Sequence, residues 1–415
     1  MSDTALQLTD EVSAPATPAA RFPRVLFCTS EVPQSVNAGS MQLYRVMQEY
    51  PADCVMVLGA TPHQDAQLLD CTYEPLRLMT YRMACTRFRA WTTGFNAVNT
   101  WREPQIGRSV RLARKFDPDL VITVMDKLSY YKHAWALSRR LGVPLVTITM
   151  DDPETFERAT RWLQPAVTRF LRRLYSQAAL SLGVSAEMCD DILKRFGKTS
   201  TLFQFGPPDR IRPRNAEESR SLKSADRLTL AYAGSLGLGY YEGLRAILPT
   251  IERTGAVLNL YTRDQHCVIR HPSIINRGAH RAEELWPVVQ SECDVLLQPY
   301  AFDGPMVRVY RTHFPTKISE YCWAGMPILV SGPSDATGVR WAMRHPEAAR
   351  AATSLDAEGL GAVIERLKAD HALRVSMAEG ARAAAQEEFD PIAIRRRFAD
   401  LLRTAARPRA SRIAQ

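Results

Sequence analysis

Short apolar runs alternate with helix-like segments along most of the chain. The runs are continuously apolar, which is typical of strands buried on both faces of a parallel sheet. In the first half they lie at 24–30, 54–60, 119–125, 144–150 and 180–185. In the second half they lie at 228–234, 256–262, 293–300 and 326–332. The pattern predicts an α/β protein with two Rossmann-like, doubly wound domains.

Helical periodicity in several spacers, and a polar break near the middle, complete this organisation. Helices are predicted at 41–50, 165–178, 242–253, 282–292, 316–324, 357–368, 371–388 and 391–405. Segment 207–227 is rich in Pro and charge and has no apolar period, so we interpret it as a linker. We therefore expect a flexible tail at 1–20 and domains at 21–206 and 228–390. Ligands bind beyond the carboxyl ends of strands in open parallel sheets, so the cleft between the domains is the expected site.

Composition narrows the class of protein. Apolar residues make up 46% of the 415 residues and charged residues 23%, as in soluble globular proteins. The sequence has no apolar run long enough to span a membrane and no signal peptide at its start, which predicts a cytoplasmic protein. The eight cysteines show no metal-binding spacing and are expected to be reduced thiols.

The net charge of +9 would suit nucleic acid, an anionic membrane or acidic small molecules. No nucleic-acid-binding motif is present, so nucleic acid is not expected as a partner. The helix at 165–178 carries Arg169, Arg172 and Arg173 on a face apart from its apolar stripe. That basic face is either solvated or in contact with anionic lipid at the inner membrane face, and both interpretations stay open.

Glycines follow the first strand of each predicted domain. Gly39 and Ser40 stand where a helix begins, a place that favours anions; a plain turn with a serine cap is the alternative. In the second domain Gly234, Gly237 and Gly239 crowd one strand–helix turn. Each costs backbone entropy, which favours close approach of the backbone to a phosphate or a sugar.

The segment HFPTKISEYCWAGMPILVSGP (313–333) carries the most chemistry. If Thr316 caps the helix, Lys317 lies in its first turn and Glu320 lies one turn on. The helix end and Lys317 would suit a phosphate, and Glu320 could accept hydrogen bonds from two ribose hydroxyls. The alternative is a solvent-facing Lys317 and a Glu320 that pairs only within its helix.

The pattern F-P-T-K-x-x-E-Y-x-x-A-G-x-P in this segment resembles the donor-nucleotide motif of glycosyltransferases with the GT-B fold, especially family 4 and its relatives. The segments AGSLG, LGVSAEM, PLVTITMDDPETF and FDPIAIRRRFADLL are similar to further parts of that family, so the likeness runs from Arg24 to about Leu402. The resemblance implies that Glu320 holds the donor ribose and that Thr316 and Lys317 neighbour the diphosphate.

The same resemblance implies further contacts. Gly39 and the 234–239 turn, with Ser235, would close around the phosphates. The segment 278–281, with His280, would meet the nucleobase. Residues 391–415 would form a helix that crosses back to the first domain, followed by a tail.

The chain departs from the family at three places. Ser235 and Glu242 stand near positions where many relatives have an Arg and a Lys for the diphosphate. Thr312 stands where many have a first Glu, and Met150 where many have a His. A leaving diphosphate needs positive charge.

Cations near the motif are the candidates to supply that charge. Arg308, Arg311 and Lys317 are the nearest in sequence. Of these, Lys317 is the first choice and Arg311 the second.

Carboxylates after strand ends are the candidates for work on the acceptor. Asp151 and Asp152 could orient or deprotonate a hydroxyl, or simply cap the next helix; Asp126 is a weaker candidate. The D-P-D at 117–119 matches a metal-binding pattern but precedes a strand, so we interpret it as a turn. No metal and no cofactor are expected.

These observations predict a metal-independent glycosyltransferase of hexosyltransferase type, whose relatives commonly retain anomeric configuration. It would move a sugar from a nucleoside-diphosphate donor to a glycan, lipid-linked or small-molecule hydroxyl, in glycan, polysaccharide or glycolipid assembly. A nucleotide-sugar epimerase on the same fold, and a non-catalytic nucleotide-sugar or glycan-binding relative, are the alternatives.

Overall fold

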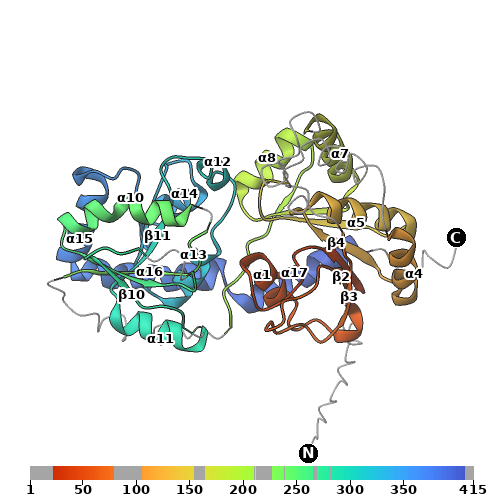
Figure 1. Cartoon of the computed structure of the whole chain (residues 1–415), viewed down its shortest axis with the longest axis horizontal. Coiled ribbons are helices and arrows are strands. Elements are labelled where there is room, and N and C mark those ends of the chain that lie inside the picture. Colours follow the sequence, from red (N-terminus) through yellow and green to blue (C-terminus); the bar gives the residue numbers. More distant parts are fainter. Residues whose placement is uncertain are drawn as a thin grey trace, which may run out of the picture.

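Two sheets, each built of parallel strands, lie side by side in the molecule (Figure 1). The computed structural model describes residues 22–78, 105–153, 164–209, 211, 227–237, 239–264, 269–280 and 282–406. The predicted tail at 1–20 and most of the predicted linker at 207–227 lie outside them. Among the described residues, no helix has the length and apolar character needed to cross a bilayer.

The first sheet has seven strands in the order β3-β2-β1-β4-β5-β6-β7. Its strands are β1 (Val25–Thr29), β2 (Val55–Gly59), β3 (Thr72–Pro75), β4 (Leu120–Val124), β5 (Leu145–Thr149), β6 (Leu180–Gly183) and β7 (Thr201–Leu202). Its helical segments are α1 (Ala38–Met47), the 3-10 turn η1 (Ala52–Cys54), α4 (Ile106–Phe116), α5 (Leu128–Leu141), α7 (Gln164–Gln177) and α8 (Ala186–Phe196). All residues of β1, β2, β4 and β5 are buried, as the continuous apolar runs predicted.

The second sheet has six strands in the order β10-β9-β8-β11-β12-β13. Its strands are β8 (Thr229–Ala233), β9 (Val257–Tyr261), β10 (Ile274–Asn276), β11 (Val295–Pro299), β12 (Ile328–Ser331) and β13 (Ala349–Ala352). Its helices are α10 (Tyr240–Arg253), α11 (Ala282–Glu292), α12 (Val307–Tyr310), α13 (Thr316–Ala324), α14 (Thr337–Arg344), the π-helical turn η3 (Ala357–Gly361), α15 (Ala362–Ala369) and α16 (His371–Glu388). The predicted α/β class with two doubly wound sheets is confirmed.

The last helix, α17 (Pro391–Ala405), crosses back from the second sheet and lies beside α1 (Figure 1). Phe398 on α17 contacts Phe203, with ring centroids 5.2 Å apart. Arg395 on the same helix pairs with Glu49, with a 2.9 Å distance between nitrogen and oxygen. The crossing helix that the sequence predicted is therefore present, and it ties the second half of the chain to the first domain.

The strand order reverses once in each sheet, between β1 and β4 and between β8 and β11. The segments that leave the carboxyl ends of such strands border a crevice, where open α/β sheets hold their ligands. In the first domain these segments carry Ser30 and Asp126, and in the second they carry Gly234 and Tyr300.

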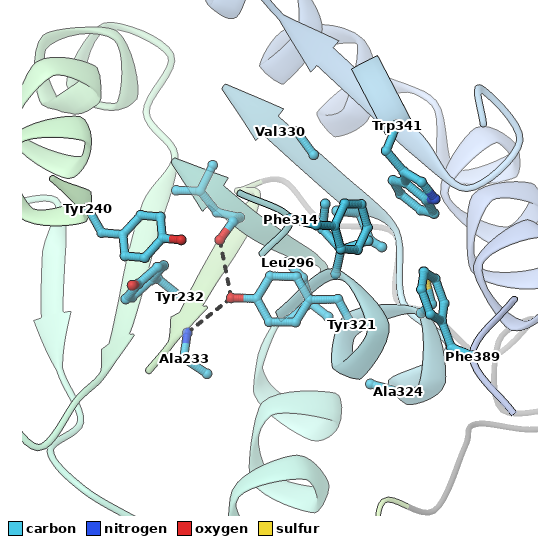
Figure 2. Packing of buried hydrophobic residues seen from close by; sticks show 14 of the residues in the cluster. Tyr232, Ala233, Tyr240, Leu296, Phe314, Tyr321, Ala324, Val330, Trp341 and Phe389 are labelled. Carbon is cyan, nitrogen blue, oxygen red and sulfur yellow. Dashed lines mark hydrogen bonds between the residues drawn. The ribbon is translucent and has the colours of Figure 1, made fainter. Parts of the chain in front are cut away.

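Helix α13 is anchored on the second sheet by a buried tyrosine. Figure 2 shows the Tyr321 hydroxyl between β8 and β11, where it accepts from the Ala233 N–H and donates to the Leu297 carbonyl, both at 3.3 Å. Phe314, just before the helix, packs near Phe389 with ring centroids 6.2 Å apart. The predicted motif therefore sits on a rigid support.

Helix α7 carries the basic face noted in the sequence. Its apolar stripe, with Val167, Leu171 and Leu174, is buried, as predicted. The Arg172 Nε donates to the Arg195 carbonyl, and the Arg173 guanidinium lies 5.2 Å from the Trp135 ring centroid. Contact of this face with lipid stays a prediction.

Candidate functional site

Helix α13 begins and ends with residues that fix its direction. Pro315 precedes it in an extended conformation (φ −75°, ψ 119°), and Thr316 is the first helical residue. The prediction that Thr316 caps the helix is therefore wrong, because Pro315 occupies the cap position and cannot supply a side-chain cap hydrogen bond. Gly325 ends the helix with φ 65°, in the left-handed region that glycine adopts readily.

Lys317 points onto the aromatic rings of the second domain, and the residue is partly buried there. Its Nζ lies 4.3 Å from the ring centroid of Tyr240 and 5.2 Å from that of Tyr232. Burial lowers the pKa of Lys317 to about 8, against the opposing effect of the Glu320 and Asp264 carboxylates. A cation held over π faces and partly stripped of water interacts strongly with any anion that reaches it.

Gly234 makes room for this lysine. A Cβ at Gly234 would overlap the Cε of Lys317, and the residue has φ 134°. The structure gives this glycine a packing role, because it lets the lysine side chain cross the turn; its predicted role toward a ligand stays a prediction.

The glycine-rich turn already binds an anion from its own chain. The Asp264 carboxylate accepts hydrogen bonds from the Leu236 N–H at 2.6 Å and from the Ser235 hydroxyl at 3.0 Å. Gly237 donates its N–H to the Ser235 Oγ at 3.2 Å. The turn therefore has the donors that an anion needs, while its role toward a phosphate stays a prediction.

Gly239 lets α10 approach α12 closely. It has φ 77°, and a Cβ there would overlap the Tyr310 hydroxyl and lie 3.1 Å from the Met306 Cβ.

We expect Gly239→Ala to lower the free energy of unfolding by about 2–3 kcal/mol, because it combines a strained φ with a clash. Gly255→Ala is the matched control: Gly255 has φ 66° but no atom within 4 Å of a Cβ, so about 1 kcal/mol is expected. Chemical denaturation measures both, and equal losses would contradict the packing role of Gly239.

Glu320 is paired with the opposite domain. Its Oε1 lies 2.9 Å from Nη1 of Arg45 on α1, and the two side chains are 21% and 11% exposed. The interpretation that Glu320 pairs only within its own helix is therefore wrong. The interdomain pair fixes one carboxylate oxygen of the predicted ribose-binding residue.

Asp151 also contacts the second domain. Its Oδ1 lies 2.8 Å from Nδ1 of His313, three residues before α13. Burial alone would lower the pKa of His313, but the Asp151 carboxylate outweighs it and the pKa is raised. The raised pKa favours the protonated imidazole beside Asp151, in the same domain as Lys317.

Asp152, the neighbour of Asp151, is held inside the first domain. Its Oδ1 lies 3.0 Å from Nη1 of Arg195 on α8, and its side chain is buried. Of the two predicted carboxylates, Asp151 is therefore the one that meets the second domain. The alternative, in which Asp151 and Asp152 cap the next helix, concerns residues 154–163, which lie outside the described residues.

A second polar cluster lies at the strand-order reversal of the first domain. Asp126 accepts from the Ser30 hydroxyl, and burial raises the pKa of Asp126 to about 6. Ser40 lies inside α1 rather than capping it, and its hydroxyl donates to Glu31 at 2.8 Å. A Cβ on Gly39 would lie 3.5 Å from Glu31 Oε2, so Gly39 belongs to this cluster. The predicted role of Gly39 and Ser40 toward the donor phosphates stays a prediction.

Two further predicted residues have partners of their own. Arg311 Nε lies 2.6 Å from Asp335 Oδ2 on a half-exposed surface, so its charge is partly neutralised there. The His280 ring packs edge-on against Tyr261, with centroids 5.4 Å apart. Their roles toward the diphosphate and the nucleobase stay predictions.

Sequence reasoning missed Arg45, His313, Asp264 and Tyr240. Asp264 follows strand β9, and the strand-end rule that selected Asp126 and Asp151 would have found it. Arg45 and His313 had no such signal, because their partners belong to the other domain.

Protein-family models give no match to this chain, and no curated protein matches it. Several solved structures do match the chain. HepE from Anabaena in complex with UDP superposes with a TM-score of 0.66 at 14% identity, covering 92% of this chain and 100% of that one. Sucrose-phosphate synthase from Thermosynechococcus elongatus gives 0.62 at 14% identity, covering 92% and 99%. A glycosyltransferase from Rickettsia africae gives 0.59 at 9% identity, covering 92% and 98%. The predicted GT-B fold is confirmed.

Proposed function

We propose that the protein is a glycosyltransferase that uses a nucleoside-diphosphate sugar. The observation that carries this proposal is Lys317, a desolvated cation held over Tyr240 one helical turn from Glu320, at the carboxyl edge of the second sheet. Charge develops on the diphosphate as the glycosidic bond breaks, and a preorganised cation stabilises it. The GT-B neighbours support the proposal; one of them, HepE, has been solved with UDP-glucose.

In this proposal each side of the cleft has a separate task. Glu320 accepts from the ribose hydroxyls, and Lys317 meets the diphosphate. From the first domain, Asp151 orients the acceptor hydroxyl or takes its proton, and His313 holds its carboxylate in place. Closure of the two domains would exclude water and align donor with acceptor.

Finer features belong to the same proposal. The reaction would need no metal and would retain anomeric configuration, and the acceptor would be a hydroxyl in glycan, polysaccharide or glycolipid assembly. The enzyme would act in the cytoplasm, with the basic face of α7 near anionic lipid.

A ligand panel tests the proposal. Thermal unfolding is measured with UDP-, GDP-, ADP-, CDP- and dTDP-sugars, beginning with UDP-glucose. A donor at a hundredfold its Kd is expected to stabilise the protein by about 2.7 kcal/mol. A panel without any stabilising compound would contradict a nucleotide-sugar site.

A non-catalytic sugar-nucleotide-binding protein is the second candidate. It is favoured by Asp264, whose carboxylate occupies the Leu236 N–H and the Ser235 hydroxyl of the glycine-rich turn. A panel that yields binding, but neither transfer to any of a set of hydroxyl acceptors nor slow donor hydrolysis, would favour this candidate over the enzyme.

A further inference from the structure

The two domains meet through an ion pair that joins the predicted donor motif to α1. Arg45 Nη1 donates to Glu320 Oε1 at 2.9 Å, although the two residues are 275 positions apart in the chain. The Arg45 side chain is 11% exposed, and its Nη2 lies 3.1 Å from the Met41 sulfur. The guanidinium is thus held at the contact between the two domains, by Met41 from the first and Glu320 from the second.

Around this point the cations of the described residues are largely offset by carboxylates, since His313 Nδ1 lies 2.8 Å from Asp151 Oδ1. Ser235 and Glu242 supply no cation, and Arg311 is paired with Asp335. Lys317 faces two carboxylates, since Glu320 and Asp264 both act on it. A nucleoside diphosphate brings about two or more negative charges and needs more compensation than one lysine provides.

A guanidinium can provide this compensating charge while it stays hydrogen-bonded to a carboxylate. Arginine has five N–H donors in a rigid plane, so one edge can hold a carboxylate while another binds a phosphate oxygen. Arg45 contacts the carboxylate that would hold the ribose, and the diphosphate follows the ribose directly in any nucleoside diphosphate. A lysine at this position could not bridge the two groups in a fixed geometry.

We propose that Arg45 is a donor-binding residue contributed by the first domain, which binds the diphosphate of the nucleotide while it holds Glu320. This inference rests on the proposed function and adds a residue to the same site. The first domain then contributes directly to donor affinity, and donor binding favours the closed arrangement of the domains.

Isothermal titration of the full chain tests the inference. The best-binding compound among UDP, GDP, ADP, CDP and dTDP is titrated into the wild type, Arg45→Met and Arg45→Lys, alongside its nucleoside. Arg45→Met is expected to weaken the diphosphate about tenfold or more and the nucleoside less than twofold, with Arg45→Lys between. Arg108→Met is the matched control, because Arg108 also makes a 2.9 Å ion pair, with Glu74, within the first domain. It is expected to bind like the wild type.

Several outcomes would overturn the inference. Unchanged diphosphate affinity in Arg45→Met would do so, and so would tighter binding, which would mean that Arg45 competes with the ribose for Glu320. Equal losses for diphosphate and nucleoside would make Arg45 a positioning residue for Glu320 alone. If Arg45→Met does not fold, Arg45→Gln replaces it, because its amide can still donate to Glu320 while the positive charge is removed; the selective loss of diphosphate affinity is still expected. Failure of the wild type to bind any of the five compounds would instead refute the proposed function itself, and this inference with it.

Discussion

Replacing Lys317 with methionine is expected to lower kcat/KM for sugar transfer by about 100- to 1,000-fold. The methionine keeps most of the length and apolar contact of the side chain over Tyr232 and Tyr240 but removes the charge. The diphosphate would then leave without its nearest cation. Steady-state kinetics with the donor found by the panel measures the loss.

The same substitution is expected to make the protein more stable. Burial lowers the pKa of Lys317 from 10.5 to about 8, so the charged form is unfavourable in the folded state. Between these two pH values the unfolded chain binds more protons, so the stability of the wild type rises with pH across that window. At pH 7 the full penalty is present, and its removal should raise the free energy of unfolding by about 1–3 kcal/mol.

The combination of lost activity and gained stability would identify Lys317 as a residue kept for function. Lys317→Arg serves as the control, because it retains charge but does not fit the same space over the rings; it should lose activity without gaining stability. A Lys317→Met enzyme that turns over at the wild-type rate would refute the site assignment. A loss of both activity and stability would instead point to a structural role.

The sequence predicted those parts of the fold whose signal is local. Strand β4 was predictable because four of its five residues are apolar and all five are buried. The bounds of α13 followed from Pro315 before it and Gly325 after it. Strands β3, β10 and β13 were missed because they are edge strands without a run of large apolar residues, and β7 because it has only two residues.

The candidate site, like the fold, was predictable only where its signal is local in the sequence. Lys317 and Glu320 were predictable because one helical turn sets their spacing and a strand end sets their place. Their environment was not, because it depends on how two domains meet: Arg45 reaches Glu320, and His313 reaches Asp151, only in the folded chain. Inspection of residues near the motif in the sequence therefore could not identify basic side chains that reach this site from elsewhere in the chain. The structure brings Arg45 and His313 to the contact between the domains, while Arg311 pairs with Asp335.

Replacing Asp151 with asparagine is expected to lower the transfer rate by about 100-fold, because the acceptor hydroxyl loses the carboxylate that orients it or takes its proton. The variant should also lose a pH-dependent part of its stability. The pKa of His313 is raised above 6.5 in the folded protein, so the wild-type ion pair contributes fully below pH 6.5. That contribution disappears as the pH rises through the raised pKa.

Denaturation of the wild type and Asp151→Asn at a series of pH values measures this difference. We expect Asp151→Asn to be less stable by about 1–2 kcal/mol at pH 6 and to approach the wild type in alkaline buffer. Asp152→Asn is the matched control, because the partner of Asp152 is Arg195, which does not titrate in this range. Its stability deficit should be independent of pH. A pH-independent deficit in Asp151→Asn as well would mean that His313 is neutral in the folded protein. Of the two basic side chains at the domain contact, Arg45 and His313, only Arg45 would then carry a positive charge.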